Sequence, residues 1–178
     1  MPQKESHPEP NPPAPAKSLL HQLGRPIPLT IEQIDIVLRL VTAARKHVDI
    51  VLDLGCGDGM ISAAILSEHP HARAVVVDGL EAGLNAARAL LRPHDARTEF
   101  VPADFTAPGW VDAVRRHGPF DVVVSGFATH HASDNRKREV YREIFDLLRP
   151  EGLFVNLEHV ASATRWSESV WADYMIDA

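Results

Sequence analysis

A glycine-rich loop is the feature of this sequence whose residue types and spacing point most directly to chemistry. Residues 53–59 read Asp-Leu-Gly-Cys-Gly-Asp-Gly and follow a short apolar run without a break. Glycines at alternate positions allow positive φ angles and a close approach of the backbone to a ligand. The helix expected after the loop would present free N–H groups to a carboxylate or a phosphate. We therefore expect residues 53–59 to bind a cofactor.

Two classes of cofactor use a loop of this kind. A dinucleotide requires the pattern Gly-x-Gly-x-x-Gly/Ala. If that pattern began at Gly55, its third glycine would fall on Met60, and the start at Gly57 places it on Ser62. The negative charge of Asp58 would also repel a pyrophosphate. S-adenosylmethionine carries a sulfonium and an ammonium group and no phosphate, so acidic residues around the loop favour this second cofactor.

Several motifs occur in the order found in class I S-adenosylmethionine-dependent methyltransferases. Residues 53–59 resemble the Asp/Glu-x-Gly-x-Gly-x-Gly signature of that family. Residues 120–125 resemble its Phe-Asp-x-Val-x-Ser segment, and the pair His130 and His131 is common among members that act on small molecules. Residues 149–152 resemble its Leu-x-Pro-Gly-Gly turn, with Glu151 in place of the first glycine. The resemblance spans roughly residues 27–160.

The segments after the second and third predicted strands have expected roles in the same site. Asp78 can accept hydrogen bonds from both hydroxyls of a ribose, or cap the next helix, and the two roles are compatible. The resemblance assigns Gly79 and Leu80 to the adenine, Asp104 to its amino group and Phe105 to packing on the ring. An ordinary loop aspartate is the alternative at residue 104. The predicted cofactor-binding residues are Asp53, Gly55, Cys56, Gly57, Gly59, Asp78, Gly79, Leu80, Asp104, Phe105 and Ser125.

The acceptor side of the site is expected after the fourth and fifth strands. Methyl transfer is an in-line displacement, in which the enzyme mainly aligns the acceptor atom, the methyl carbon and the sulfur. A general base helps only where the acceptor atom carries a proton of high pKa. His131 is the first candidate for such a catalytic base and His130 the second, with structural packing of one and solvation of the other as the alternative. Glu158 and His159 are weaker candidates for lining the acceptor pocket.

Apolar runs and helical patterns alternate along the chain, which predicts an α/β fold. Thr30 and Gln33 form a capping box for a helix expected to end near His47, which could cover the cofactor or simply pack on the core. Strands are expected at residues 50–54, 74–78, 98–101, 120–125 and 153–157, and further helices at 60–68, 82–91, 110–117, 134–148 and 163–174. Continuous apolar strands indicate a parallel sheet buried on both faces. Right-handed crossovers then give a doubly wound, Rossmann-like sheet of order 3-2-1-4-5, with ligands beyond the carboxyl ends of its strands.

The two ends of the chain depart from this pattern. Residues 1–17 contain six prolines and almost no apolar side chain, so we expect a disordered tail followed by one methyltransferase domain over residues 18–178. Family members usually continue after strand five with an antiparallel hairpin, whereas Trp166, Trp171 and Tyr174 indicate a helix. We therefore expect the hairpin to be missing, so that the domain is C-terminally truncated, naturally minimal, or completed by a partner. Strand five would then form an exposed sheet edge through which a homodimer could assemble.

Composition narrows the remaining classes of function. The 178 residues are 45% apolar and 24% charged, which is typical of a soluble domain. The sequence has neither an apolar run long enough for a membrane span nor a signal peptide, so the cytoplasm is expected. The single cysteine, Cys56, excludes an intramolecular disulfide and a cysteine-rich zinc site, and the scattered histidines predict no metal. The net charge is −6, and the cluster at residues 136–138 is interpreted as a solvated helix face, so no nucleic-acid partner is expected.

The sequence thus predicts an enzyme that transfers a methyl group from S-adenosylmethionine to a small-molecule acceptor. A non-catalytic module that binds S-adenosylmethionine or a partner protein is the first alternative. A nucleotide-dependent oxidoreductase is the second, and the residues at positions 60 and 62 argue against it because they break the dinucleotide pattern.

Overall fold

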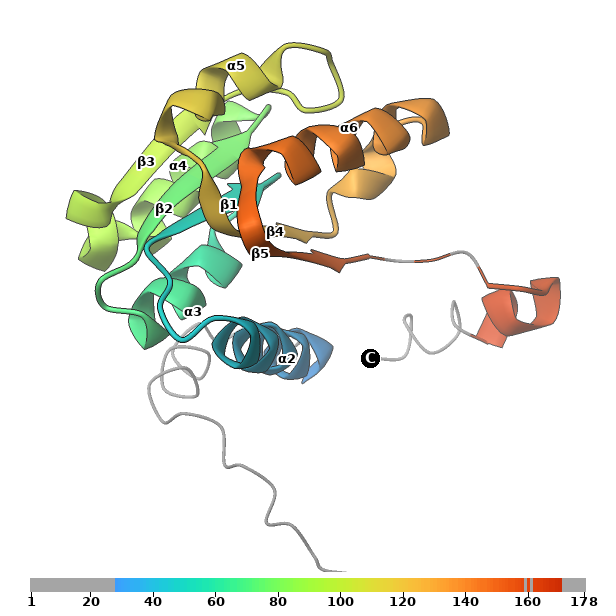
Figure 1. The fold of residues 1–178 in the computed structure, drawn as a ribbon. Coiled ribbons are helices and arrows are strands. Elements are labelled where there is room, and N and C mark those ends of the chain that lie inside the picture. Colours follow the sequence, from blue (N-terminus) through green and yellow to red (C-terminus); the bar gives the residue numbers. More distant parts are fainter. Residues whose placement is uncertain (1–27, 159, 161, 171–178) are drawn as a thin grey trace, which may run out of the picture.

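The computed structural model describes residues 28–158, 160 and 162–170. Their core is a five-stranded sheet of order β3-β2-β1-β4-β5, in which each neighbouring pair of strands is parallel (Figure 1). The strands are β1 (Ile50–Leu54), β2 (Arg73–Asp78), β3 (Thr98–Pro102), β4 (Phe120–Gly126) and β5 (Leu148–Leu157). The doubly wound fold and the strand order predicted from the sequence are therefore confirmed.

Helices cover both faces of the sheet. The helices are α2 (Pro28–Ala44), α3 (Met60–Glu68), α4 (Glu81–Leu90), α5 (Trp110–Val114) and α6 (Asp134–Leu147), with 3-10 segments η1 (Arg92–Arg97), η2 (Arg115–His117) and η3 (Thr129–His131). Buried side chains of α2, α3 and α4 pack in one hydrophobic cluster, and those of α5 and α6 pack in another. Among the described residues, no helix is both long and apolar enough to cross a membrane.

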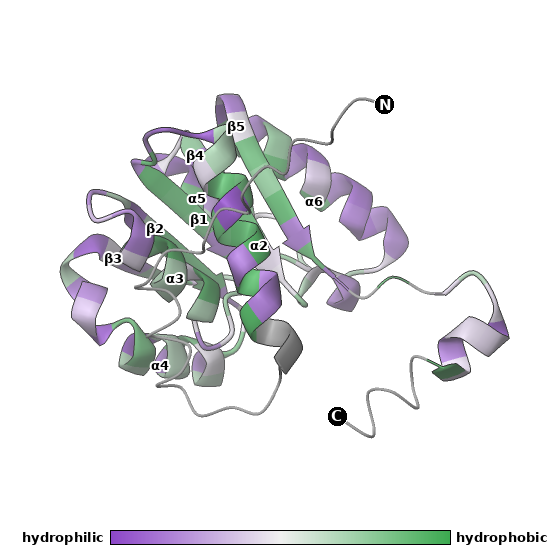
Figure 2. Ribbon diagram, turned by 90° about the horizontal axis from the view of Figure 1, so that it is seen from below, coloured by the Kyte–Doolittle hydropathy of each residue, from purple (hydrophilic) through white to green (hydrophobic). Residues whose placement is uncertain are grey.

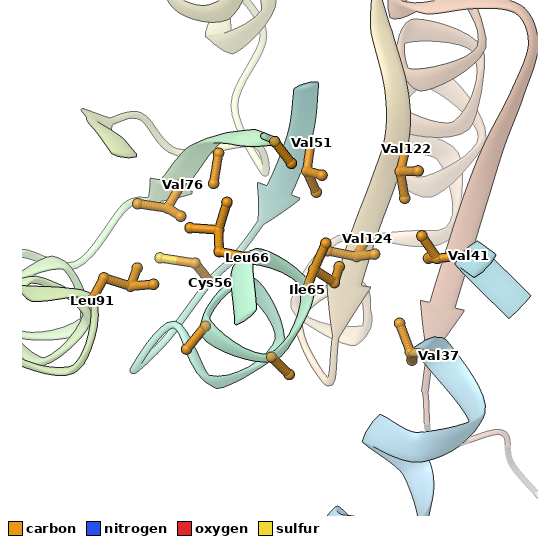
Figure 3. Close-up of a cluster of buried hydrophobic side chains, with 14 of the residues drawn as sticks. Val37, Val41, Val51, Cys56, Ile65, Leu66, Val76, Leu91, Val122 and Val124 are labelled. Atoms are coloured by element: carbon orange, nitrogen blue, oxygen red, sulfur yellow. The ribbon is translucent and has the colours of Figure 1, made fainter. Parts of the chain in front are cut away.

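The sheet divides its side chains between these two clusters. Val51 and Val76 lie in the cluster beneath α2, α3 and α4, whereas Leu52 and Val75 lie in the cluster beneath α5 and α6 (Figure 3). Successive side chains of a strand point to opposite faces, so a strand covered on both faces must be apolar throughout. Figure 2 shows the result as mostly hydrophobic strands beside an α6 helix that is largely hydrophilic.

Among the predicted element boundaries, the start of the first described helix is wrong. The first described helix already begins at Pro28, a residue favoured at the first helical position, so Thr30 lies inside the helix and is not its cap. At the other end, residues 165–170 are helical, and the remainder of the predicted helix at 163–174 lies outside the described residues. The predicted tail at residues 1–17 also lies outside them.

A buried carboxylate joins three elements at the amino ends of the strands. Asp121 of β4 is fully buried, and its Oδ2 accepts the backbone N–H groups of Asp49 and Ile50 at 2.8 and 3.0 Å. Its Oδ1 lies 2.6 Å from Nη2 of Arg45 and 2.9 Å from Nη1 of Arg149. A buried charge persists only when it is paired and hydrogen-bonded, and these contacts supply both. Asp121 therefore holds β1, β4 and β5 together at the end of the sheet opposite the predicted site.

Strand β5 begins earlier than predicted and contains an irregularity. It starts at Leu148, and its register with β4 breaks between the pairs Phe120–Leu148 and Val122–Leu153. The segment predicted as a turn is therefore a bulge within the strand, and Glu151 adopts a left-handed φ of 63° there. β5 is the last strand of the described sheet, as predicted, and the homodimer through its free edge stays a prediction.

The strained conformation of Glu151 yields a stability prediction. Glu151→Gly should raise the free energy of unfolding by roughly 0.5–1 kcal/mol, because the left-handed region costs an L-residue about 1–2 kcal/mol and the greater freedom of unfolded glycine offsets part of that gain. Urea unfolding followed by circular dichroism measures the difference. As a control, Gly152→Ala should destabilise, because its Cβ would lie 2.9 Å from the carbonyl oxygen of Arg149. A Glu151→Gly variant less stable than the native chain would contradict the prediction.

Candidate functional site

The glycine loop after β1 has the backbone geometry that its sequence predicts. Gly55, Gly57 and Gly59 have φ angles of 69°, 53° and 77°, all in the left-handed region. A Cβ on Gly55 would lie only 2.4 Å from Cβ of Ala128, so this glycine is required for packing. A Cβ on Gly57 would meet nothing within 4 Å. The backbone at Gly57 therefore faces open space, where a ligand can approach it closely.

Carboxylates of the chain itself occupy N–H groups of this loop. The N–H of Gly57 donates to Oδ2 of Asp78 at 2.9 Å, and that of Met60 donates to Oδ1 of Asp58 at 3.3 Å. The N–H groups of Gly55 and Cys56 donate to the carbonyl of Val77. The loop is thus an acidic surface on which these N–H groups are already engaged, an arrangement that suits a cationic ligand better than a phosphate.

Asp53 supplies a buried acceptor beneath the loop. Its side chain is 1% exposed, and its Oδ2 accepts the hydroxyl of Ser62 at 2.6 Å. Its Oδ1 is buried and has no hydrogen-bond partner among the described residues. Burial raises the pKa of this carboxyl to about 6. An unpaired buried carboxylate oxygen is costly, and an ammonium group of a ligand would offset that cost.

Asp78 links the loops after β1 and β2. Besides the Gly57 contact, its Oδ1 accepts the N–H of Leu80 at 2.8 Å. Each oxygen of an ionised carboxylate has a second lone pair, so both can still accept from a ribose. Leu80 is 72% exposed, and Gly79 beside it packs so closely on Asp104 that a Cβ would lie 3.2 Å from the Asp104 Cβ. The structure therefore brings the predicted ribose and adenine residues together.

The loop after β3 has a shape fixed by its own side chain. Oδ1 of Asp104 accepts the N–H and the hydroxyl of Thr106 at 2.8 and 2.6 Å, and these hydrogen bonds lower the pKa of Asp104. Asp104 remains exposed, so its predicted bond to the adenine amino group stays a prediction. Phe105 is buried in the cluster beneath α5 and α6, which indicates a packing role, and its adenine contact also stays a prediction.

Two other predicted cofactor residues have buried side chains. The hydroxyl of Ser125 donates to the carbonyl of Leu54 at 2.8 Å and so ties the end of β4 to the end of β1. Cys56 packs in the cluster beneath α2, α3 and α4, and burial raises the pKa of its thiol (Figure 3). Both lie at the carboxyl end of the sheet as expected, and their direct contact with a cofactor stays a prediction. The α2 helix buries Val37 and Val41 against the core, which is the packing role left open for it.

The acceptor side contains a histidine held by a carboxylate. Nδ1 of His130, in η3, lies 2.8 Å from Oε1 of Glu158, which follows β5. Oε2 of Glu158 also accepts the backbone N–H of His130 at 3.0 Å and the hydroxyl of Thr129 at 2.9 Å. The ring of His131 lies beside that of His130, with centroids 4.1 Å apart. The other predicted pocket residue, His159, lies outside the described residues.

The sequence interpretation missed several residues of this arrangement. Thr129 is buried and hydrogen-bonded both to Glu158 and to the side-chain amide of Asn156.

Arg136, expected on a solvated helix face, is instead buried and hydrogen-bonded, so that interpretation is wrong for this residue. No periodicity or motif marks an arginine whose partners are backbone carbonyls of a distant loop. Across residues 28–158, 160 and 162–170, no group of three metal-ligating side chains is found.

The raised pKa of Asp53 predicts a pH dependence of stability. The folded state favours the protonated carboxyl, so this contribution is complete below the ordinary aspartate pKa of 3.8 and is lost as the pH rises through the raised pKa of about 6. Asp53→Asn is neutral at every pH. Its free energy of unfolding, relative to the native chain, should therefore increase between about pH 4 and pH 7, by up to about 3 kcal/mol. Urea unfolding at several pH values measures this, with the exposed Asp95→Asn as control. A difference that stays constant with pH would count against the burial of an unpaired carboxylate.

Comparison with known proteins places this site in a family. A family model described as a methyltransferase domain matches residues 51–152. A 24-methylenesterol C-methyltransferase of rice, Oryza sativa subsp. japonica, is 36% identical over 115 residues, which cover 64% of this chain and 30% of that protein. An uncharacterized methyltransferase of Mycobacterium bovis is 28% identical over 124 residues, covering 68% of this chain and 57% of its own length. The chain therefore spans less than two thirds of the length of these relatives.

Solved structures show the same fold. An O-methyltransferase family protein of Burkholderia thailandensis superposes with a TM-score of 0.66 at 26% identity, covering 84% of this chain and 43% of that one. An amino pentose methyltransferase of Micromonospora echinaspora, solved with S-adenosylmethionine bound, gives a TM-score of 0.60 at 20% identity and covers 86% of this chain and 60% of that one. Because the family match takes in more than half of the sequence, the protein belongs to the methyltransferase domain family, with the class I S-adenosylmethionine-dependent fold.

Proposed function

We propose that this chain binds S-adenosylmethionine at the carboxyl ends of β1, β2 and β3 and transfers its methyl group to a small-molecule acceptor beside His130. The observation that carries the proposal is the convergence of an acidic, ligand-accessible glycine loop and a carboxylate-held histidine at one end of the sheet. When bound, the cofactor supplies an activated methyl group on a sulfonium. The family match and the fold support this reaction type.

The residues of the loop fit that cofactor. The unpaired Oδ1 of Asp53 is a buried acceptor for an ammonium group, and the open backbone at Gly57 allows close approach of the ligand. Asp78 would accept from the ribose hydroxyls, and the exposed side chain of Leu80 would lie against the adenine. The acidic side chains that already occupy the loop N–H groups would oppose a pyrophosphate, which argues against the oxidoreductase alternative.

The geometry favours His130 over His131 as the catalytic base. Glu158 accepts only, so the neutral ring of His130 places its proton on Nδ1 and leaves a lone pair on Nε2. That nitrogen can take a proton from a hydroxyl or amino group as the methyl bond forms. The carboxylate of Glu158, itself held by Thr129, fixes the ring and stabilises the imidazolium that results. In the described part of the chain, no hydrogen bond or ion pair joins the ring of His131 to a carboxylate.

The proposed base yields a kinetic prediction. His130→Gln should lower kcat for a hydroxyl acceptor by about 100-fold or more, since a positioned base contributes about 10²–10⁴-fold. His131→Gln should lower it much less, and neither should greatly change KM for S-adenosylmethionine. A panel of hydroxyl- and amino-bearing small molecules, assayed with methyl-labelled S-adenosylmethionine, identifies an acceptor for these measurements.

The same assay separates the enzyme from its alternative. If the folded chain binds S-adenosylmethionine and methylates no member of a broad panel, the non-catalytic binding module is supported instead. If an acceptor is found and the His130→Gln and His131→Gln variants lose equal activity, the assignment of the base to His130 is wrong. The Glu158→Gln variant should lose part of the activity that His130→Gln loses, because it keeps the ring and weakens only its orientation.

A further inference from the structure

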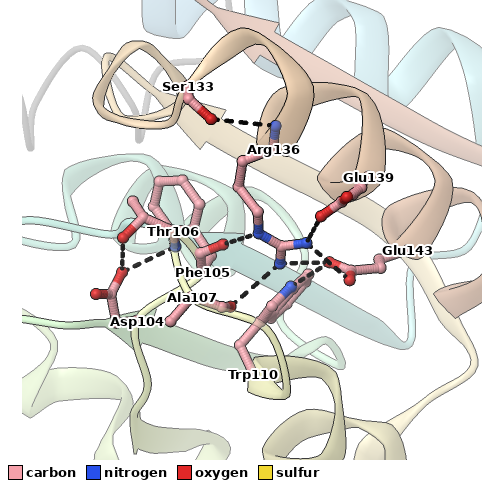
Figure 4. A network of polar contacts seen from close by, with 9 residues as sticks. All are labelled: Asp104, Phe105, Thr106, Ala107, Trp110, Ser133, Arg136, Glu139 and Glu143. Atoms are coloured by element: carbon pink, nitrogen blue, oxygen red, sulfur yellow. Dashed lines mark hydrogen bonds and ion pairs between the residues drawn. The ribbon is translucent and has the colours of Figure 1, made fainter.

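Arg136 occupies an unusual place in the first turn of α6. Lys137 is partly exposed and Arg138 is exposed, whereas Arg136 is only 8% exposed. Figure 4 shows its guanidinium among Phe105, Ala107 and Glu143. Its Nε donates to the carbonyl of Phe105 at 3.0 Å. Nη1 donates to Glu139 and to Glu143, both at 3.0 Å, and Nη2 donates to Glu143 at 2.8 Å and to the carbonyl of Ala107 at 3.2 Å. A guanidinium has five N–H donors, and each of them has a partner here.

Two of these partners belong to the loop after β3. The carbonyls of Phe105 and Ala107 flank Thr106, whose own N–H and hydroxyl are held by Asp104. The hydrogen bonds of Asp104 therefore fix the conformation within the loop, and those of Arg136 fix the position of the loop relative to α6. Among the described residues, Arg136 is the side chain that donates hydrogen bonds to these two carbonyls.

The guanidinium is itself anchored. Both oxygens of Glu143, two turns further along the same face of α6, accept from it, and Nε1 of Trp110 in α5 donates to the same carboxylate at 2.5 Å. Trp110 is buried beneath α5 and α6. The loop, α5 and α6 thus meet in one partly buried polar network, in which a fully bonded guanidinium is rigid because any rotation breaks several hydrogen bonds.

The position of this loop matters to both neighbouring loops. Asp104 packs against Gly79, where a Cβ would lie 3.2 Å away, and the ring atom Cε1 of Phe105 would lie 3.2 Å from a Cβ on Gly55. A displacement of residues 104–107 would therefore disturb the glycine loop and the loop after β2 as well as Asp104.

We propose that Arg136 is a positioning residue that holds the loop after β3 in the conformation that receives the adenine end of S-adenosylmethionine. The inference rests on the proposed cofactor site and adds a residue that would touch neither cofactor nor acceptor. It requires the planar fork of arginine, because a lysine ammonium cannot bond two separated carbonyls and a bidentate carboxylate together. The role belongs to binding, since the hydrogen bonds of Arg136 go to the loop after β3 and to α6 and not to His130 or Glu158.

The test uses calorimetric titration of the full chain with S-adenosylhomocysteine and with adenosine. Arg136→Lys and Arg136→Gln should each weaken binding of both ligands by at least about tenfold, the loss expected when one hydrogen bond to a charged group is misplaced. Arg138→Gln, which removes the same charge from an exposed position on the same helix, should bind as the native chain does. So should Glu139→Gln, because Glu139 is largely exposed and accepts only one of the five hydrogen bonds of Arg136.

A kinetic split distinguishes positioning from general stability. With an acceptor in hand, Arg136→Lys should raise KM for S-adenosylmethionine about tenfold and leave kcat within about twofold, because saturation restores the bound state. All assays are run below the unfolding transition of each variant, which circular dichroism verifies. If Arg136→Gln fails to fold, Arg136→Lys provides the test. Unchanged affinity in a folded Arg136→Lys chain, or an equal loss in Arg138→Gln, overturns the inference. If the native chain binds neither ligand, the proposed cofactor site itself fails and this inference fails with it.

Discussion

The carboxylate of Asp78 is the contact on which the cofactor side of this structure depends. It accepts the N–H of Gly57 from the loop after β1 and that of Leu80 from its own loop, so it holds the two loops at one distance. This contact is possible because β1 and β2 are parallel and end in register, with Leu54 paired to Val77. Strand β3 ends at the same level, with Asp78 paired to Pro102, so the loop that contains Asp104 lies beside the other two loops. The three loops form one surface because the parallel strands that precede them end at the same level of the sheet.

The two ends of the sheet differ in how completely their buried carboxylates are hydrogen-bonded and paired. At the amino ends, Asp121 is buried and fully compensated by two arginines and two backbone N–H groups. At the carboxyl ends, Asp53 is equally buried and keeps an oxygen without a partner among the described residues, and burial raises its pKa. A compensated charge is tolerated in the interior, whereas an uncompensated one carries a desolvation cost that a cationic group of a ligand would offset. The hydrogen bond between His130 and Glu158 lies at this same end of the sheet.

The sequence predicted the sheet well because local patterns determine it. Continuous apolar runs mark strands buried on both faces, and the glycine loop requires left-handed backbone that few other residues adopt, so the strand order and the loop geometry were confirmed. Contacts between distant segments left no such pattern. Arg136 resembles an exposed basic residue until its carbonyl partners are known, and the bond between His130 and Glu158 joins residues after two different strands. The predicted start of α2 was also wrong. Thr30 is a residue type that often caps a helix, but the helix already begins at Pro28.

The central claim, that the loops joined by Asp78 form a site for S-adenosylmethionine, is tested most directly by calorimetric titration of the native chain and of Asp78→Ala. Asp146→Ala, an exposed acidic residue of α6, controls for the change in charge. The account predicts micromolar binding by the native chain and by Asp146→Ala, and its loss in an Asp78→Ala chain that circular dichroism shows to be folded. Absence of binding by the folded native chain, or undiminished binding by Asp78→Ala, would contradict it.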